Sequence, residues 1–208
     1  MKTARRSSVL VAATALVLCM SGAVGAETIV RKSTSYFQIG GTTAEDLDRE
    51  LARRGPETRS TGSRHPGATQ IRFGGEITYL QQGNRCRVGE TKVTLNTRII
   101  LPSWKNRKKA KGDLGLIWDA LSSDIKRHEE RHAEIARQHA RQLEKALQKL
   151  RPERDCDRMQ QKVAETTDKI IAAHDAAQIE FDRVEAVNFE SRLIRILDYR
   201  ARRNSPKN

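Results

Sequence analysis

The stretch that decides the fold is residues 113–151, which read DLGLIWDALSSDIKRHEERHAEIARQHARQLEKALQKLR. Its apolar and imidazole side chains recur at steps of three and four residues, the spacing of one face of an α-helix. They are Ile117, Leu121, Ile125, His128, His132, Ile135, His139, Leu143 and Leu147. Because the residue before a proline disfavours helical geometry, Arg151-Pro152 predicts the end of one long helix.

Within this helix, His128-Glu129-Glu130-Arg131-His132 has the form H-E-x-x-H. Four residues make slightly more than one helical turn, so His128 and His132 share a face and can bind one Zn²⁺. Glu129 can reach a water on that metal, whose pKa falls from near 15.7 toward about 7. The motif predicts zinc-dependent hydrolysis with Glu129 as general base. The alternative is structural: two hydrogen-bonded core imidazoles, or part of a solvated, arginine-rich helix.

A catalytic zinc normally takes a third protein ligand, and the sequence leaves its identity open. His139 lies two turns beyond His132, about 10 Å along the same helix, and no glycine between them breaks the helix. His174, Glu180 and Glu185 lie on the next predicted helix, and each also suits an ordinary structural role. A site without a third protein ligand is the remaining possibility.

Ahead of the long helix, the sequence has the pattern of β-strands. The polarity of the side chains alternates over residues 28–40, toward Tyr36-Phe37-Gln38-Ile39, and the pattern stops at Gly40-Gly41. This predicts a strand that ends in a turn. Residues 69–80 and 90–101 predict two more strands, and Gln82-Gly83-Asn84 between them suits a hairpin.

Between the first two predicted strands, a short helix is expected. It begins at Thr42 or Thr43 and ends at Arg54, before Gly55-Pro56. Residues 57–67 are rich in Ser, Thr, Gly and Pro and predict an exposed loop. Residues 105–111 hold five cations in seven positions, which indicates a solvated loop or a patch for an acidic partner.

After Pro152 a second helical pattern runs from Met159, and a shorter third helix is expected near Asn188. Strands first and helices second predict an α+β fold in one domain, residues 27–208. We expect an N-terminal antiparallel β-sheet with a short helix over residues 27–112. The long active-site helix and C-terminal helices follow over residues 113–208, and the whole arrangement is zincin-like.

Residues 1–26 have the features of a secretory signal peptide. A basic start is followed by the apolar run Val9–Met20 and by the small-residue cleavage site Val24-Gly25-Ala26. The apolar run is too short to span a bilayer comfortably, so we expect cleavage near Ala26, a periplasmic or secreted protein, and no transmembrane span. Lipidation at Cys19 is an alternative, although Leu18 is larger than the usual attachment signal has at that place.

The chain is strongly basic, with a formal net charge of +13 over 208 residues. Loss of Lys2, Arg5 and Arg6 with the signal peptide lowers this charge to +10. Outside the cytosol we expect no nucleic-acid partner. Peptide substrates, acidic ones among them, and anionic cell-envelope surfaces fit the charge better.

Two cysteines, Cys86 and Cys156, remain after the expected cleavage. An exported pair in an oxidising compartment most often forms one disulfide, here closing a loop of about 70 residues. Two zinc-ligating thiolates are the weaker alternative, because the pair lacks a close C-x-x-C spacing.

Several short motifs resemble a known family, the predicted secreted zinc-dependent proteases of Gram-negative bacteria, a domain of unknown function. They are Tyr36-Phe37-Gln38-Ile39-Gly40, Gly55-Pro56, Cys86, Leu101-Pro102-Ser103-Trp104, Trp118, His128-Glu129-Glu130-Arg131-His132 and Cys156. The resemblance covers nearly the whole mature chain and implies Zn²⁺ at His128 and His132, Glu129 as base, and a Cys86–Cys156 disulfide.

The chain departs from that family at one place. Members tend to have an aromatic-Asp pair followed five residues later by His-Gly, but here Phe181-Asp182 is followed by Val187-Asn188. Either His174 or Glu185 substitutes as a ligand, or the protein binds metal poorly. Three functions are therefore open: an exported zinc metallopeptidase, a catalytically degenerate zinc-binding protein of the envelope, and a structural cell-envelope protein.

Overall fold

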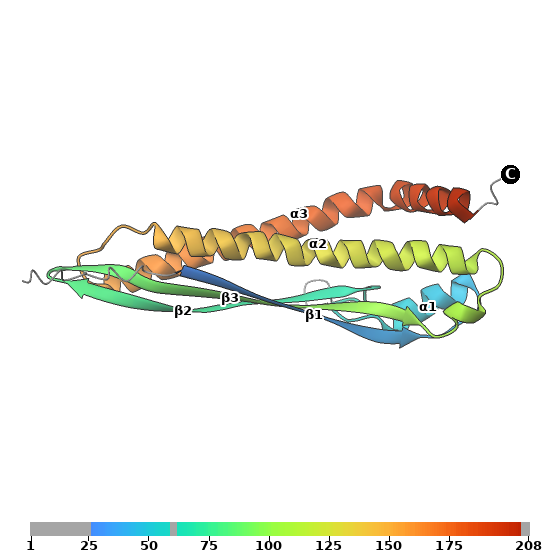
Figure 1. Ribbon diagram of the computed structural model, residues 1–208, viewed down its shortest axis with the longest axis horizontal. Coiled ribbons are helices and arrows are strands. Elements are labelled where there is room, and N and C mark those ends of the chain that lie inside the picture. Colours follow the sequence, from blue (N-terminus) through green and yellow to red (C-terminus); the bar gives the residue numbers. More distant parts are fainter. Residues whose placement is uncertain (1–25, 59–61, 205–208) are drawn as a thin grey trace, which may run out of the picture.

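The computed structural model describes residues 26–58 and 62–204 and shows an elongated α+β protein (Figure 1). Its elements, in chain order, are β1 (Ala26–Ile39), α1 (Ala44–Arg54), β2 (Ala68–Gln82), β3 (Arg85–Trp104), a short 3₁₀ helix (Arg107–Lys109), α2 (Leu114–Gln148) and α3 (Cys156–Asn204). The α+β prediction is confirmed. Residues 1–25, which include Cys19 and almost all of the expected signal peptide, lie outside the described residues.

The sheet has the order β1-β3-β2, with β3 between the other two strands. β2 and β3 form an antiparallel hairpin around Gly83, whose φ of +58° suits a glycine in a tight turn. β1 pairs with β3 in parallel, so the sheet is mixed and the prediction of an antiparallel sheet was wrong. The reason is topological: β3 returns in the direction of β1 and inserts between β1 and β2, instead of adding outside β2.

β3 carries most of the sheet's core. Its alternate residues Val93, Leu95 and Ile99 are buried, whereas Asn96 and Arg98 between them are exposed. One face of the sheet is therefore solvated, and the other is covered by α2, which lies along the strands (Figure 1).

The short helix α1 follows the prediction closely. Thr43 caps its N-terminus, since the Thr43 side chain accepts a hydrogen bond from the backbone N–H of Asp46 at 3.2 Å. Its buried Leu47 and Leu51 pack with Ile39, Trp104 and Trp118 in a core at one end of the sheet.

α2 confirms the predicted long helix, and its middle lies over the central strand. Ile125 and Ala133, on either side of the histidine pair, pack with Ile99 and Leu101 of β3. The fully buried Ala136 adds no bulk between helix and sheet, so α2 can approach closely there. This packing fixes the distance between the sheet and the turn that carries His128 and His132, and it fixes which face of that turn points away from the sheet.

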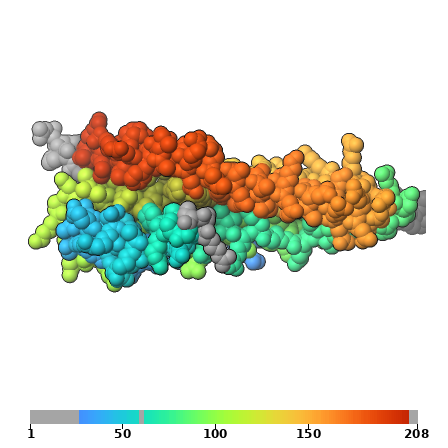
Figure 2. Space-filling view, turned by 180° about the vertical axis from the view of Figure 1, so that it is seen from behind, coloured from blue at the N-terminus to red at the C-terminus, as the bar shows by residue number. Residues whose placement is uncertain are grey.

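α3 runs back along α2 and passes the whole length of the molecule (Figures 1 and 2). It is one continuous helix from Cys156 to Asn204, so the prediction of a separate helix beginning near Asn188 was wrong. The physical reason is that no proline or glycine interrupts residues 156–204, and the exposed polar side chains between apolar positions do not end a helix.

The Cys86–Cys156 disulfide is present and confirms the predicted pairing. It joins the start of β3 to the start of α3, next to a two-way backbone bridge between Cys86 and Glu153 at 2.8 Å. Because its cysteines are 70 positions apart in the sequence, the bond contributes about 4 kcal/mol in the loop-closure treatment.

Among residues 26–58 and 62–204, none of the helices combines the length and the apolar character needed to span a bilayer.

Candidate metal centre

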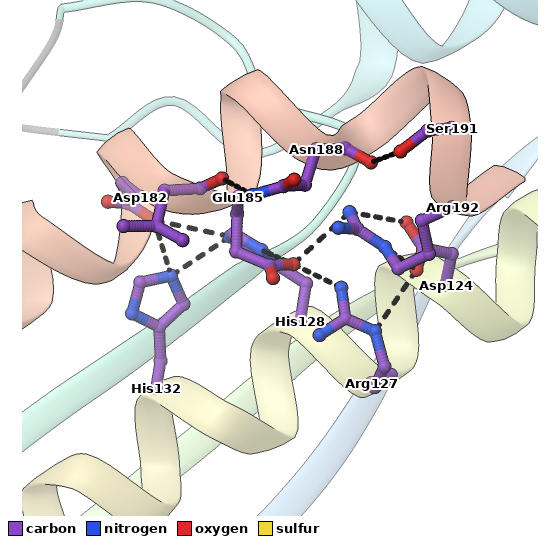
Figure 3. Close-up of polar contacts among 10 residues, drawn as sticks. Asp124, Arg127, His128, His132, Asp182, Glu185, Asn188, Ser191 and Arg192 are labelled. Carbon is purple, nitrogen blue, oxygen red and sulfur yellow. Dashed lines mark hydrogen bonds and ion pairs between the residues drawn. The ribbon is translucent and has the colours of Figure 1, made fainter.

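The two histidines of the H-E-x-x-H motif project from the same face of α2, toward α3 (Figure 3). The Nε2 atoms of His128 and His132 lie 3.0 Å apart. Phe181 of α3 packs against both imidazole rings, with centroid distances of 4.9 and 5.0 Å. The helical spacing thus brings the rings together, and an aromatic side chain from the neighbouring helix holds them there.

Asp182 of α3 completes a triangle with the two imidazoles. Its Oδ1 lies 3.3 Å from His128 Nε2 and 3.0 Å from His132 Nε2 (Figure 3). Within the described part of the chain, this is the one group of three or more His, Cys, Asp or Glu residues arranged to hold a metal ion. The Asp182 side chain is 56% exposed, so the triangle opens to solvent at the boundary of α2 and α3.

The size and chemistry of this triangle fit Zn²⁺. Zinc bonds to imidazole nitrogen and carboxylate oxygen are about 2.0–2.2 Å long, so tetrahedral ligands stand about 3.3 Å apart. The observed separations of 3.0–3.3 Å come within a few tenths of an ångström of that value. Two nitrogens and one carboxylate oxygen also form a donor set that zinc commonly takes at catalytic sites, which keep a position open.

Each Nδ1 atom of the pair faces a polar side chain of α3. Gln178 Oε1 lies 2.5 Å from His132 Nδ1, and Glu185 Oε2 lies 3.5 Å from His128 Nδ1. Burial lowers the pKa of His128, and the neighbouring charge of His132 lowers it further against the opposing effect of Asp182 and Glu185. His128 therefore favours the neutral form, which is the form that binds metal.

Glu129 points away from solvent and is only 5% exposed. The Thr69 hydroxyl of β2 lies 2.8 Å from Glu129 Oε2 and 2.9 Å from the Glu129 carbonyl oxygen, and it can donate to either. Burial raises the pKa of Glu129, although the Thr69 hydrogen bond and the charge of His132 lower it. The buried carboxylate is thus held in place and shifted toward the range useful for proton transfer near neutral pH.

The loop before β2 reaches Glu129 because residue 67 is a glycine. A Cβ atom at Gly67 would lie 2.7 Å from Ile125 Cγ2 and 3.0 Å from Glu129 Oε1. The absence of a side chain lets this segment close over the buried carboxylate.

Beside the triangle lies a cluster of four charged groups that joins α2 to α3 (Figure 3). Asp124 accepts hydrogen bonds from Arg192 at 2.7 and 3.2 Å and from Arg127 at 3.0 Å. Glu185 pairs with Arg127 and, at 3.1 Å, with Arg192. Burial alone would raise the pKa of both carboxyls, but their arginine partners outweigh it and hold each pKa below its ordinary value. These carboxylates are charge-compensated.

None of the three residues considered as a third ligand belongs to the triangle. Glu185 is engaged with the arginines, Glu180 pairs with Arg183 on the solvent side, and His174 connects to His132 only through Gln178. His139 donates from Nδ1 to the Ile135 carbonyl of its own helix at 2.9 Å.

The other residues that bear on the sequence predictions for metal binding are the two cysteines and the pair Val187-Asn188, which stands at the family's His-Gly position. The disulfide removes Cys86 and Cys156 as thiolate ligands. Val187 is highly exposed, and Asn188 donates to the Val184 carbonyl at 2.8 Å; neither residue belongs to the group that could hold a metal ion.

Sequence reasoning missed two residues, Asp182 and Gln178. A signal for Asp182 was present, since Phe181-Asp182 matches the aromatic-Asp pair of the similar family. Gln178 precedes Asp182 by four residues and so shares its helix face, but a glutamine in a polar helix carries no signal of its own.

Comparison with known proteins identifies a family. The profile of a bacterial protein family of unknown function, DUF922, matches residues 34–189, which include every residue of the triangle, Glu129 and both cysteines. No curated protein and no solved structure matches the chain.

Proposed function

The chain belongs to DUF922, a bacterial family of unknown function, and we propose that it is a zinc-dependent metallopeptidase. One observation carries the proposal: His128 Nε2, His132 Nε2 and Asp182 Oδ1 lie within 3.3 Å of one another, and the buried Glu129 is the residue that follows His128. In this assignment His128, His132 and Asp182 are the metal ligands and Glu129 is the general base.

A zinc ion bound there would polarise the peptide carbonyl and make water reactive near neutral pH. Glu129 takes a proton from the attacking water at its carboxylate and passes it to the leaving amine, so water and amide yield a carboxylic acid and an amine. The raised pKa of Glu129 supports this role, because a base whose pKa lies nearer the working pH both accepts and returns a proton readily. Thr69 holds one Glu129 oxygen in place.

Export to the periplasm or beyond is part of the proposal. A disulfide persists in oxidising compartments and is rare in the bacterial cytosol, so the Cys86–Cys156 bond supports that location. The net charge of +10 that is expected after loss of the signal peptide favours peptide substrates with acidic segments, and anionic envelope surfaces are a further candidate partner.

A second function, metal binding without catalysis, is favoured by one feature of the site. The side chain of Asp182 is 56% exposed, whereas the side chains of His128 and His132 are 27% and 14% exposed. A solvated carboxylate is a weaker ligand than a buried one, so zinc could exchange too readily to support turnover.

The test begins with zinc content. Mature protein, purified without chelator and supplied with zinc, is expected to contain one zinc per chain by elemental analysis. A stoichiometry near zero would refute both the peptidase and the metal-binding function.

The second step separates these two functions. Glu129→Gln keeps the shape of the side chain and should abolish cleavage of an unfolded protein substrate while zinc content is unchanged. Glu130→Gln is the matched control, because the neighbouring Glu130 is exposed and forms only a 3.9 Å contact with Lys126. If the wild type binds zinc but does not cut the substrate, the metal-binding function replaces the peptidase. Equal cleavage by the Glu129 variant and the wild type would rule out Glu129 as the base.

A further inference from the structure

Gln178 contacts His132 at two points. Its Oε1 lies 2.5 Å from the ring Nδ1, and its Nε2 donates to the His132 backbone carbonyl at 3.1 Å. Because a carbonyl oxygen can only accept, the amide end nearest to it must be the NH₂ group. The oxygen end therefore faces the ring, and the orientation of the amide follows from the contact itself.

This orientation decides which nitrogen of His132 carries the hydrogen. An amide oxygen only accepts, so the short contact to Gln178 requires a hydrogen on His132 Nδ1. A neutral imidazole has a single N–H, and its other nitrogen then has a free lone pair. In His132 that nitrogen is Nε2, the atom that faces His128 and Asp182.

Gln178 is in turn held by His174, a buried residue of the same helix. Gln178 Nε2 lies 2.8 Å from His174 Nε2, and His174 Nδ1 lies 2.9 Å from Asp175 Oδ1. Since a carboxylate only accepts, His174 donates from Nδ1 to Asp175 and accepts from Gln178 at Nε2. Phe73 of β2 packs edge-on against the His174 ring, with centroids 5.0 Å apart, and fixes its plane.

We propose that Gln178 is a positioning residue, which holds His132 in the tautomer whose Nε2 is free for metal, and that His174 and Asp175 hold the Gln178 amide. The hydrogen bonds run in one direction, from His132 Nδ1 to Gln178, from Gln178 to His174 and from His174 to Asp175, whose carboxylate can only accept. This inference rests on the proposed metal centre at His128, His132 and Asp182. It adds that the site is preorganised before metal arrives.

The first test needs no substitution. In zinc-free wild-type protein with ¹⁵N-labelled histidine, at about pH 8 where neutral imidazole predominates, NMR should show the His132 proton on Nδ1. A proton on His132 Nε2 would overturn the proposal.

The second test compares two replacements of Gln178 in a competition assay with a chromophoric zinc chelator. Gln178→Met has a similar size but no acceptor, and it should release the tautomer and weaken zinc binding about 10- to 100-fold. Gln178→Glu keeps an acceptor for Nδ1 and should bind zinc within about threefold of the wild type, with the tautomer retained. A residue that only packs would predict the opposite order, because methionine preserves apolar packing and a buried carboxylate does not.

Gln161→Met is the matched control, since Gln161 is an exposed glutamine of α3 whose amide contacts only Arg158 and Glu165. It should change neither the tautomer nor the zinc affinity. If Gln178→Met binds zinc as the wild type does, Gln178 has no positioning role, while the metal centre itself stands. If the wild type binds no zinc, the proposed function fails, and the tautomer measurement still tests the role of Gln178.

Discussion

Replacing Asp182 by alanine should weaken zinc binding roughly a hundredfold. Four-ligand zinc sites bind with about 10–16 kcal/mol, or about 2.5–4 kcal/mol for each ligand. The lower end applies here, because the Asp182 carboxylate is 56% exposed and water competes with the metal ion for it. Since about 1.4 kcal/mol corresponds to a factor of ten, the loss is close to two orders of magnitude.

The measurement is competition with a chromophoric chelator at fixed pH, with circular dichroism to verify that the variant is folded. Asp198→Ala is a matched control, because Asp198 is an exposed aspartate on the same helix. Asp182→Asn retains a weaker oxygen donor and should lie between the alanine variant and the wild type. An alanine variant that binds zinc within about threefold of the wild type would show that Asp182 is not a ligand.

Three further predictions concern stability. Removing the Cys86–Cys156 bond with a double serine variant should lower the unfolding free energy by about 4 kcal/mol and Tm by roughly 8–16 °C, and an unchanged melting curve would contradict this. Asp124→Asn should destabilise the protein by about 1–3 kcal/mol at neutral pH, because Arg192 and Arg127 lose their ion pairs with Asp124, although Glu185 still pairs with both. Folding lowers the pKa of Asp124, so this residue contributes to the unfolding free energy at pH values above its ordinary pKa. That contribution is lost as the pH falls through the pKa of the folded state. The unfolding free energy of the variant should therefore depend less on pH in the acid range than that of the wild type. Folding raises the pKa of Glu129, so its effect on stability is opposite to that of Asp124. The unfolding free energy falls as the pH rises from the ordinary pKa of a glutamate to the pKa of Glu129 in the folded protein. At neutral pH, zinc-free Glu129→Gln should therefore have a higher Tm than the zinc-free wild type.

The charged cluster of Asp124, Arg127, Glu185 and Arg192 also bears on how α3 is aligned along α2. Buried charges need partners. Asp124 of α2 and Glu185 of α3 each form ion pairs with Arg127 of α2 and Arg192 of α3. The cluster therefore favours the observed register of α3 along α2, since a shift of one turn would separate Asp124 from Arg192. That register is the one in which Asp182 reaches the histidine pair.

The fold could be predicted where local patterns decide it. The apolar stripe of α2, the Thr43 cap of α1 and the glycine turn at Gly83 are properties of a few neighbouring residues, and each was found in its expected place. The parallel pairing of β1 with β3 was not predicted, because the local sequence of β1 predicts a strand but not which other strand it pairs with.

The sequence by itself determined that His128 and His132 share a helix face and that Glu129 lies between them, because these relations follow from the helical repeat alone. The tertiary structure alone decided that Asp182 meets the histidines and that Gln178 faces His132 Nδ1, at separations of 50 and 46 residues along the chain. Contacts of that kind depend on how two helices are aligned, and the alignment is set by the sheet beneath α2, the disulfide at one end and the paired charges between the helices.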